Sequence, residues 1–239
     1  MRRDCMWVLE IYQSKQGEGI WTGTYSVFVR LLGCPLRCSY CDTIYARYLP
    51  DNPNFEHGAD ISPEEIAGRV LLLDQPHVVI TGGEPMQSNG ITQLTKLLKD
   101  FDYKITIETA GIFFTDVYCD LMSISPKLSN SRPINSSNHN ELKQHDETYS
   151  KPDIVQKLMA RYNYQLKFVV DTPQDLDEIN LYLVNLQNVI PERVLLMPQA
   201  TDIITMDQKA QWIIPHCESR GFSYCPRMQI VWYGNKQRT

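Results

Sequence analysis

The 239-residue sequence lacks the features that would anchor it in a membrane or export it. No apolar run approaches the roughly 18 residues that span a bilayer. Asp4 and Glu10 interrupt the N-terminal stretch where a secretory signal would need an unbroken apolar core. An excess of positive charge is also missing, because 23 Lys and Arg stand against 28 Asp and Glu, a formal net charge of −5. These absences predict a cytoplasmic protein that binds neither membrane nor nucleic acid directly.

Internal repeats and low-complexity linkers are absent as well, and the length suits one substantial domain. We therefore expect a single domain over residues 1–239, with one polar excursion around 128–150. Residues 128–145 are rich in Asn and Ser and are typical of an exposed loop or insertion.

Short apolar runs recur along the chain and predict β-strands, because they are rich in branched residues and bounded by polar or Gly/Pro positions. They occupy residues 25–32, 77–81, 104–109, 121–125, 165–170 and 193–197. Helix-like segments lie at 89–99, 153–162 and 207–220, and capping sequences at 62–65 and 172–175 predict two more helix starts. This alternation predicts an α/β fold with about six parallel strands, a partial TIM-like barrel. A further edge strand is expected at 229–233.

The cysteines do not suggest disulfides, because seven is an odd number in a chain with no export signal. Cys34, Cys38 and Cys41 fall within eight residues. Three explanations are open: small apolar residues on one helix face, a zinc site, or an iron–sulfur cluster. Pro35 and the preceding strand favour a loop, and the next histidine, His57, is distant for a local fourth zinc ligand. Three thiolates suit a [4Fe–4S] cluster that leaves one iron open to a small ligand.

The cysteine spacing, followed at the next strand end by Thr81-Gly-Gly-Glu-Pro85, resembles the radical S-adenosylmethionine (SAM) superfamily. There the open iron binds the amino and carboxylate groups of SAM, and an electron from the cluster cleaves SAM to a radical. The two glycines would allow close approach of a ligand, and Glu84 would receive the SAM ammonium group. Because SAM and the cluster would carry out the radical chemistry, we predict no catalytic side chain. The implied cofactor contacts are Cys34, Cys38, Tyr40, Cys41, Asp42, Gly83, Glu84, Ser125, Pro126, Lys127 and Gln199.

Residues 12–19, 21–23, 28–30, 41–43 and 229–239 together resemble the 7-carboxy-7-deazaguanine synthase family, over essentially the whole chain. That family converts 6-carboxy-5,6,7,8-tetrahydropterin to 7-carboxy-7-deazaguanine with loss of ammonia, toward queuosine. The resemblance implies Mg2+ as a third cofactor, a reductant such as flavodoxin or ferredoxin, and a homodimer. It implies a Mg2+ contact at Thr43 and substrate contacts at Lys15, Gln16, Gly17, Arg30 and Thr81.

The chemistry of these side chains suits a small carboxylated pterin. Gln16 offers an amide to the pterin edge, and Arg30 offers a bidentate partner for the substrate carboxylate. Glu18 either orients this loop or contacts the substrate. Two other classes remain open: a glycyl-radical-enzyme activase or other radical SAM enzyme, and a non-enzymatic iron–sulfur or zinc module that docks through the Asn/Ser-rich loop. The segment 16–19 favours the pterin enzyme over an activase.

Overall fold

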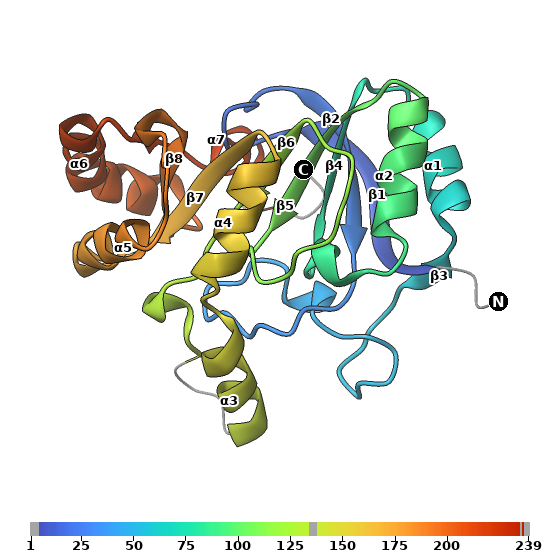
Figure 1. The fold of residues 1–239 in the computed structure, drawn as a ribbon, viewed down its shortest axis with the longest axis horizontal. Coiled ribbons are helices and arrows are strands. Elements are labelled where there is room, and N and C mark those ends of the chain that lie inside the picture. Colours follow the sequence, from blue (N-terminus) through green and yellow to red (C-terminus); the bar gives the residue numbers. More distant parts are fainter. Residues whose placement is uncertain (1–4, 134–137, 235, 237–239) are drawn as a thin grey trace.

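The computed structural model describes residues 5–133, 138–234 and 236, and this part of the chain forms one nine-stranded sheet (Figure 1). The strand order is β3-β1-β2-β4-β5-β6-β7-β8-β9. Residues 134–137 of the expected excursion and most of the tail beyond 234 lie outside the described residues. The strands are β1 (Met6–Lys15), β2 (Tyr25–Leu31), β3 (Ala59–Ile61), β4 (His77–Gly82), β5 (Lys104–Thr109), β6 (Leu121–Ile124), β7 (Tyr164–Val170), β8 (Val194–Pro198) and β9 (Ser223–Tyr224).

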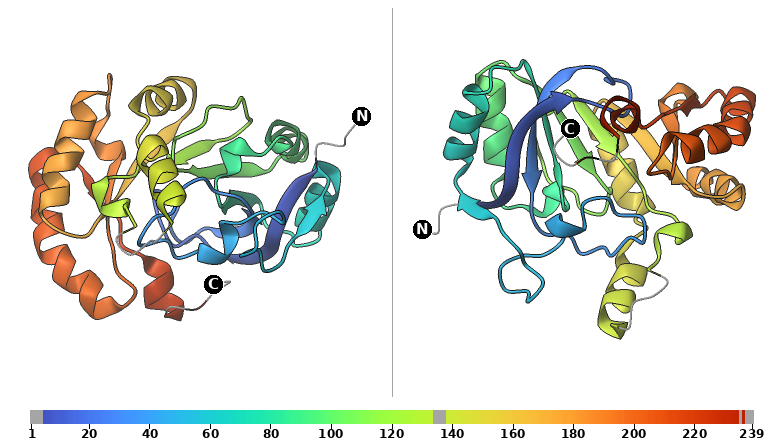
Figure 2. Two further views of the ribbon diagram at one scale, coloured as in Figure 1. Left: turned by 90° about the horizontal axis from the view of Figure 1, so that it is seen from below. Right: turned by 180° about the vertical axis from the view of Figure 1, so that it is seen from behind.

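The longer helices form a layer outside the curved sheet, as the view from below shows (Figure 2). Among the described residues, no helix is both long enough and apolar enough to cross a bilayer. The α-helices are α1 (Pro63–Leu71), α2 (Ile91–Asp100), α3 (His139–Thr148), α4 (Pro152–Arg161), α5 (Gln174–Val184), α6 (Ile203–Arg220) and α7 (Met228–Tyr233). Short 3-10 helices lie at Ile44–Ala46, Pro85–Gln87, Ser129–Ser131 and Pro191–Arg193.

The prediction of a partial barrel is confirmed. The six predicted strands are β2, β4, β5, β6, β7 and β8, and each pairs in parallel with the next. The sheet stays open, with β3 at one edge and β9 at the other. Strand β1 was not predicted; it runs antiparallel to β2, and both of its faces are partly buried, so its sequence shows no clean alternation.

Two expectations about secondary structure were wrong. The edge strand expected at 229–233 is instead helix α7, whose start lies against the loop after β1 through a hydrogen bond from Met228 N to Gly17 O, 3.0 Å. A short apolar run has no secondary structure of its own, and here the sheet edge is already occupied by β9. The polar segment 128–145, expected as a loop, contains a 3-10 turn and the start of α3, capped by the Asn138 side chain.

Successive residues of the parallel strands face opposite sides of the sheet, and this alternation separates the core from the site. On β7, Leu166 and Phe168 belong to the main hydrophobic core beneath the helices. Lys167 lies between them on the other face, and it is buried although it is charged. The same alternation on the other parallel strands places polar side chains on that inner face, namely Arg30, Thr81, Glu108 and Ser123.

One buried histidine makes the stability of the fold depend on pH. The His77 ring lies between Ser26 Oγ at 2.7 Å and Thr106 Oγ1 at 2.9 Å, and burial lowers its pKa to about 4. Both folded and unfolded chains hold His77 neutral above its ordinary pKa of about 6.5. Below that pH only the unfolded chain takes up the proton, so stability is lost as the pH falls toward 4, by about 3 kcal/mol in total.

We expect His77→Gln, which keeps two hydrogen-bonding atoms but does not titrate, to remove this part of the pH dependence. The free energy of unfolding in urea, measured at several values between about pH 7 and pH 5, should fall less steeply for the variant than for the parent. Equal slopes in the two proteins would contradict the assignment.

Candidate active site

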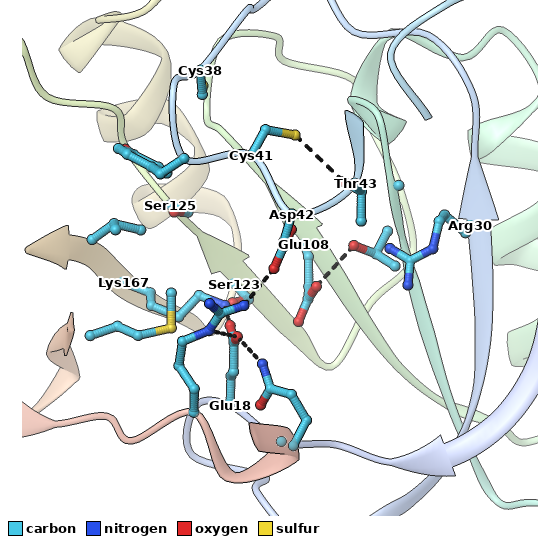
Figure 3. A pocket seen from close by; sticks show the side chains of 18 of the residues that line it. Glu18, Arg30, Cys38, Cys41, Asp42, Thr43, Glu108, Ser123, Ser125 and Lys167 are labelled. Carbon is cyan, nitrogen blue, oxygen red and sulfur yellow. Dashed lines mark hydrogen bonds and ion pairs between the residues drawn. The ribbon is translucent and has the colours of Figure 1, made fainter. Parts of the chain in front are cut away.

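A pocket of about 310 Å3 lies at the carboxyl ends of the parallel strands (Figure 3). Parallel strands bring their carboxyl ends to one edge of the sheet, so residues far apart in sequence meet there. Every predicted site residue except Glu84 and Pro126 lines this pocket. The predicted residues that line it are Lys15, Gln16, Gly17, Arg30, Cys34, Cys38, Tyr40, Cys41, Asp42, Thr43, Thr81, Gly83, Ser125, Lys127 and Gln199.

The cysteine loop follows β2 and is closed at its base by backbone hydrogen bonds. Gly33 N donates to Ala46 O at 2.9 Å and Cys34 N to Arg47 O at 3.0 Å. The Arg47 side chain returns to donate to the carbonyl of Cys38 at 2.5 Å. These hydrogen bonds restrain the loop at its base and at Cys38.

The donor set fits an iron–sulfur cluster. Burial, with the nearby Glu84 carboxylate, raises the pKa of Cys34 to about 12, and burial also raises that of Cys38. These thiols are therefore protonated until a metal displaces the protons. In the described part of the chain, no three His, Cys, Asp or Glu side chains converge closely enough to bind one metal ion. Cys34, Cys38 and Cys41 line one pocket, and three cysteine thiolates are a donor set that suits a [4Fe–4S] cluster.

The glycine turn at the end of β4 packs against the start of the cysteine loop. A Cβ atom on Gly82 would lie 2.1 Å from Leu31 O, and one on Gly83 would lie 2.0 Å from Gly33 O. Glu84 N also donates to Gly33 O, at 2.7 Å. The glycines are thus required by the approach of two backbone segments, and Gly83 lines the pocket in addition.

Glu84 lies behind the pocket wall and is 1% exposed. Its carboxylate accepts hydrogen bonds from Thr109 Oγ1 at 2.6 Å, Ala110 N at 2.8 Å and Met86 N at 3.1 Å. Burial raises its pKa. In this structure Glu84 joins the ends of β4 and β5, and its oxygens are occupied by protein donors.

Glu108 is a pocket residue that the sequence analysis missed. Its carboxylate accepts from the Gln16 amide at 3.0 Å and from Thr81 Oγ1 at 2.9 Å, two residues that the family resemblance assigns to substrate. The only signal in the sequence was a charged residue at an inner-face position of an apolar strand. Such a position is costly unless the carboxylate has partners.

Arg30 projects from β2 into the pocket, where two other residues of the amino-terminal hairpin hold it (Figure 3). Its Nε donates to Glu10 at 2.8 Å and its Nη2 donates to the Tyr12 hydroxyl at 2.8 Å. The Tyr12 ring in turn stacks on Phe28 at 5.3 Å between centroids. Neither hydrogen bond uses Nη1, so the guanidinium keeps donors for a ligand.

Glu18 is the centre of a buried charge network that the sequence did not reveal. It pairs with Lys167 of β7 and with Arg227 at 3.3 Å, and Gln229 Nε2 donates to it at 2.6 Å. Burial would raise the pKa of Glu18, but the two cations outweigh burial and lower it to about 2. Arg227 also pairs with Asp42 at 2.5 Å, so the network reaches the cysteine loop.

Gly17 permits this arrangement, because a Cβ atom there would lie 2.2 Å from Gln229 Oε1 and 2.9 Å from its backbone nitrogen. Helix α7 can pack against the loop after β1 only where that loop has no side chain. Beside it, the Lys15 ammonium lies 4.9 Å from the Tyr25 ring centroid and 5.6 Å from that of Trp232. The site is therefore closed by the C-terminal helix.

The pocket wall formed by the cysteine loop and the ends of β6 and β8 carries Thr43, Ser125, Lys127 and Gln199. Lys127 Nζ donates to Ser125 Oγ at 2.9 Å, and Thr43 Oγ1 lies 3.7 Å from Cys41 Sγ. Lys209 of α6 donates to the Gln199 carbonyl at 2.5 Å and so holds the end of β8.

A cysteine triad after the first parallel strand of an open barrel, with a pocket at the strand ends, defines a radical SAM protein. Accordingly, residues 29–129 match the family model described as "Radical SAM superfamily". The chain is 39% identical over 233 residues to 7-carboxy-7-deazaguanine synthase of Rhodopirellula baltica, covering 97% of this chain and 88% of that protein. It is 34% identical to the enzyme of that name from Pyrobaculum aerophilum, covering 95% of each chain. The chain belongs to the 7-carboxy-7-deazaguanine synthase family.

Comparison with solved structures finds the same fold. The crystal structure of QueE from Escherichia coli matches with a TM-score of 0.71 and 26% identity, over 94% of each chain. SuiB of Streptococcus suis bound to S-adenosylmethionine shares the fold at a TM-score of 0.54 and 14% identity, covering 85% of this chain and 53% of SuiB. The protein is thus a radical SAM lyase of queuosine biosynthesis, and its cofactors are a [4Fe–4S] cluster and SAM.

Proposed function

We propose that this enzyme converts 6-carboxy-5,6,7,8-tetrahydropterin to 7-carboxy-7-deazaguanine and ammonia. The observation that carries the proposal is the meeting of the cysteine loop, the loop 15–18 and Arg30 in one pocket. A radical SAM protein acting on another substrate would need the first of these but not the other two.

Four side chains and one backbone segment are proposed to hold the substrate. Arg30 pairs with its carboxylate, and the backbone of Lys15 and Gly17 borders the ring. The aminopyrimidine edge of a pterin presents adjacent N–H donors, and the Glu108 carboxylate is proposed to accept hydrogen bonds from them. Gln16 and Thr81 hold this carboxylate in position. Because these groups come from β1, β2, β4 and β5, the sheet itself sets their spacing.

The cofactors are proposed to occupy the wall formed by the cysteine loop and the ends of β4, β6 and β8. Cys34, Cys38 and Cys41 hold the cluster, and Lys127 and Arg47 supply positive charge near Cys38. When bound, the cluster and SAM supply the radical that removes hydrogen from the substrate. Contacts to SAM are proposed for the pocket-lining residues Tyr40, Asp42, Gly83, Ser125, Lys127 and Gln199. Glu84 and Pro126 do not line the pocket, and their proposed part is to support these contacts from behind the wall.

The decisive experiment is turnover by the anaerobically reconstituted enzyme with SAM and the carboxytetrahydropterin. We expect a product lighter than the substrate by one ammonia, with SAM recovered rather than consumed in proportion to product. An activase would instead consume SAM and leave the pterin unchanged. A non-enzymatic module would convert neither compound.

Arg30→Lys keeps the positive charge and the approach to Glu10 but loses the planar guanidinium. Substrate affinity should fall by about 1.5–3 kcal/mol, roughly tenfold or more, because a bidentate contact becomes a single one. Titration of the cluster-loaded enzyme with substrate and, separately, with SAM measures the two affinities. SAM affinity should be nearly unchanged; an equal loss for both ligands would mean that Arg30 supports the fold instead.

Thr43 is proposed to contact Mg2+, since its hydroxyl lies beside Cys41 at the pocket wall. Mg2+ prefers hard oxygen ligands, and one neutral hydroxyl binds it only together with substrate and water. Thr43→Ala should leave the cluster spectrum and SAM affinity intact, lower turnover and blunt its response to added Mg2+. Thr43→Ser, which keeps the hydroxyl, should restore that response. An unchanged Mg2+ activation curve for the Ala variant would refute the contact.

Three further properties are proposed because the family resemblance implies them. A homodimer, reduction of the cluster by flavodoxin or ferredoxin, and a cytoplasmic location are proposed on this basis. Sedimentation of the reconstituted enzyme tests the first of these.

A further inference from the structure

The polar segment formed by the described residues 128–133 and 138–149, which we call the clamp segment, has no role in the assignments above. The radical SAM family model ends at residue 129, where this segment begins. In Figure 1 it lies at the lower end of the molecule, on the side where the cysteine loop runs. Ser129 of this segment bonds to Glu178 of α5, and Asn130 bonds to the carbonyl of Val169. Other hydrogen bonds from the segment go to the cysteine loop.

Arg37, in the interval between Cys34 and Cys38, is the first point of contact. Its Nη1 donates to the carbonyls of Cys34 at 2.7 Å and Leu36 at 2.9 Å, which fixes the curvature of the interval. Its Nε donates to Glu141 of α3 at 2.9 Å, and the pair is mostly buried, with side chains 11% and 22% exposed. One side chain thus connects the cysteine loop to α3.

His145 provides a second contact to the same interval. It is fully buried, and its Nδ1 accepts the backbone N–H of Arg37 at 3.1 Å. Because Nδ1 is the acceptor, Nε2 carries the proton and donates to Ser131 Oγ at 3.1 Å, and Ser131 donates to Leu128 O at 2.6 Å. The ring is further oriented by Tyr149, stacked at 5.7 Å.

The interval between Cys38 and Cys41 is held as well. Ser39 N donates to Ser131 O and Ser39 Oγ donates to Asn130 O, both at 2.9 Å. Tyr149 packs into the small apolar cluster that contains Leu36 and Cys38. Both spacers between the cysteines are therefore bonded to the clamp segment.

We propose that the clamp segment positions the cysteine loop, so that the three thiols keep the cluster from losing iron. Glu141 and His145 are positioning residues in this role, because they act on the ligands through Arg37. An outside element that is bonded to a loop with three metal ligands limits the conformations that the loop samples. This role concerns the cluster alone and does not depend on the identity of the substrate.

The test measures the rate at which an anaerobic ferrous chelator removes iron from the reconstituted protein without substrate. Glu141→Gln and His145→Leu should lose iron about threefold to tenfold faster than the parent, because the first removes the carboxylate charge from the bond to Arg37 and the second removes the acceptor of the Arg37 N–H. His145→Asn keeps an acceptor near the position of Nδ1 and should fall between the parent and His145→Leu. Glu147→Gln makes the same chemical change at an exposed position of α3, 65% exposed, and should match the parent.

Thermal unfolding of the cluster-free variants separates this role from a general loss of stability. We expect the Glu141→Gln protein to unfold close to the parent's midpoint while it loses iron faster. Equal rates of iron loss in the parent, Glu141→Gln and Glu147→Gln would overturn the proposal. So would faster loss only in variants whose cluster-free form is itself destabilised. If His145→Leu does not fold, the Glu141→Gln and Glu147→Gln pair decides the question.

Discussion

Replacing Cys34, Cys38 or Cys41 with Ala should abolish the broad brown absorbance of the reconstituted protein and all cleavage of SAM. If each of the three thiolates holds one iron, as we propose, then loss of any one of them leaves an iron without its protein ligand. Iron and sulfide analysis after anaerobic reconstitution, with the visible spectrum, measures the first effect. Chromatographic detection of deoxyadenosine, released from SAM by the chemically reduced protein in the absence of substrate, measures the second.

Cys119 and Cys217 are the matched controls. Cys217 lies in the main core and Cys119 packs against it, so Ala at either position should cost stability through a small cavity and leave the cluster intact. Loss of the cluster in either control would show that the three-thiolate assignment is wrong.

Glu18→Gln should destabilise the enzyme by about 3–5 kcal/mol, because it leaves Lys167 buried without a paired carboxylate and leaves Arg227 with Asp42 alone. Lys167 is 5% exposed, so solvent cannot replace the missing carboxylate. Urea unfolding of the cluster-free protein measures the loss.

Glu65→Gln makes the same change in an exposed pair with Arg69, whose side chains are 55% and 50% exposed, and should cost at most about 1 kcal/mol. Adding Lys167→Met to Glu18→Gln removes the buried ammonium that Glu18→Gln leaves without an ion pair, and should recover part of the stability. If Glu18→Gln unfolds like the Glu65→Gln control, the network is not buried as described.

The strands could be predicted because their apolar runs are rich in branched residues and alternate with helix-like segments along the chain. Residues 77–81 and 104–109 lie between turn signals and must be buried on at least one face, so a strand beneath helices was the expected result. The run 229–233 is equally apolar but became α7, because its environment is set by contacts with Gly17 and Glu18, more than two hundred positions earlier. No local pattern encodes such a contact.

The site residues divide in the same way, into those that a local sequence pattern predicts and those that only long-range contacts place. The cysteine spacing and the glycine turn are local patterns, and the two together predict the chemistry without knowledge of the fold. Glu108 and Lys167 are single charged residues within apolar strands, and nothing near them in sequence indicates their partners. Their roles follow from the parallel register, which places Glu108 beside Ser123 on β6. The expected free loop at 128–145 was mistaken for the same reason, since its partners lie in the cysteine loop.

The sequence by itself therefore determined the fold class and the family and predicted the cluster ligands, because these depend on periodicity and on spacings within a few residues. Only the tertiary structure decided that Glu84 faces Thr109 and Ala110 behind the wall, that Glu18 joins β7 to α7, and that the polar excursion holds the cysteine loop. A buried charge or a polar loop is stable only with a partner, and that partner is chosen by how the strands and helices meet in space.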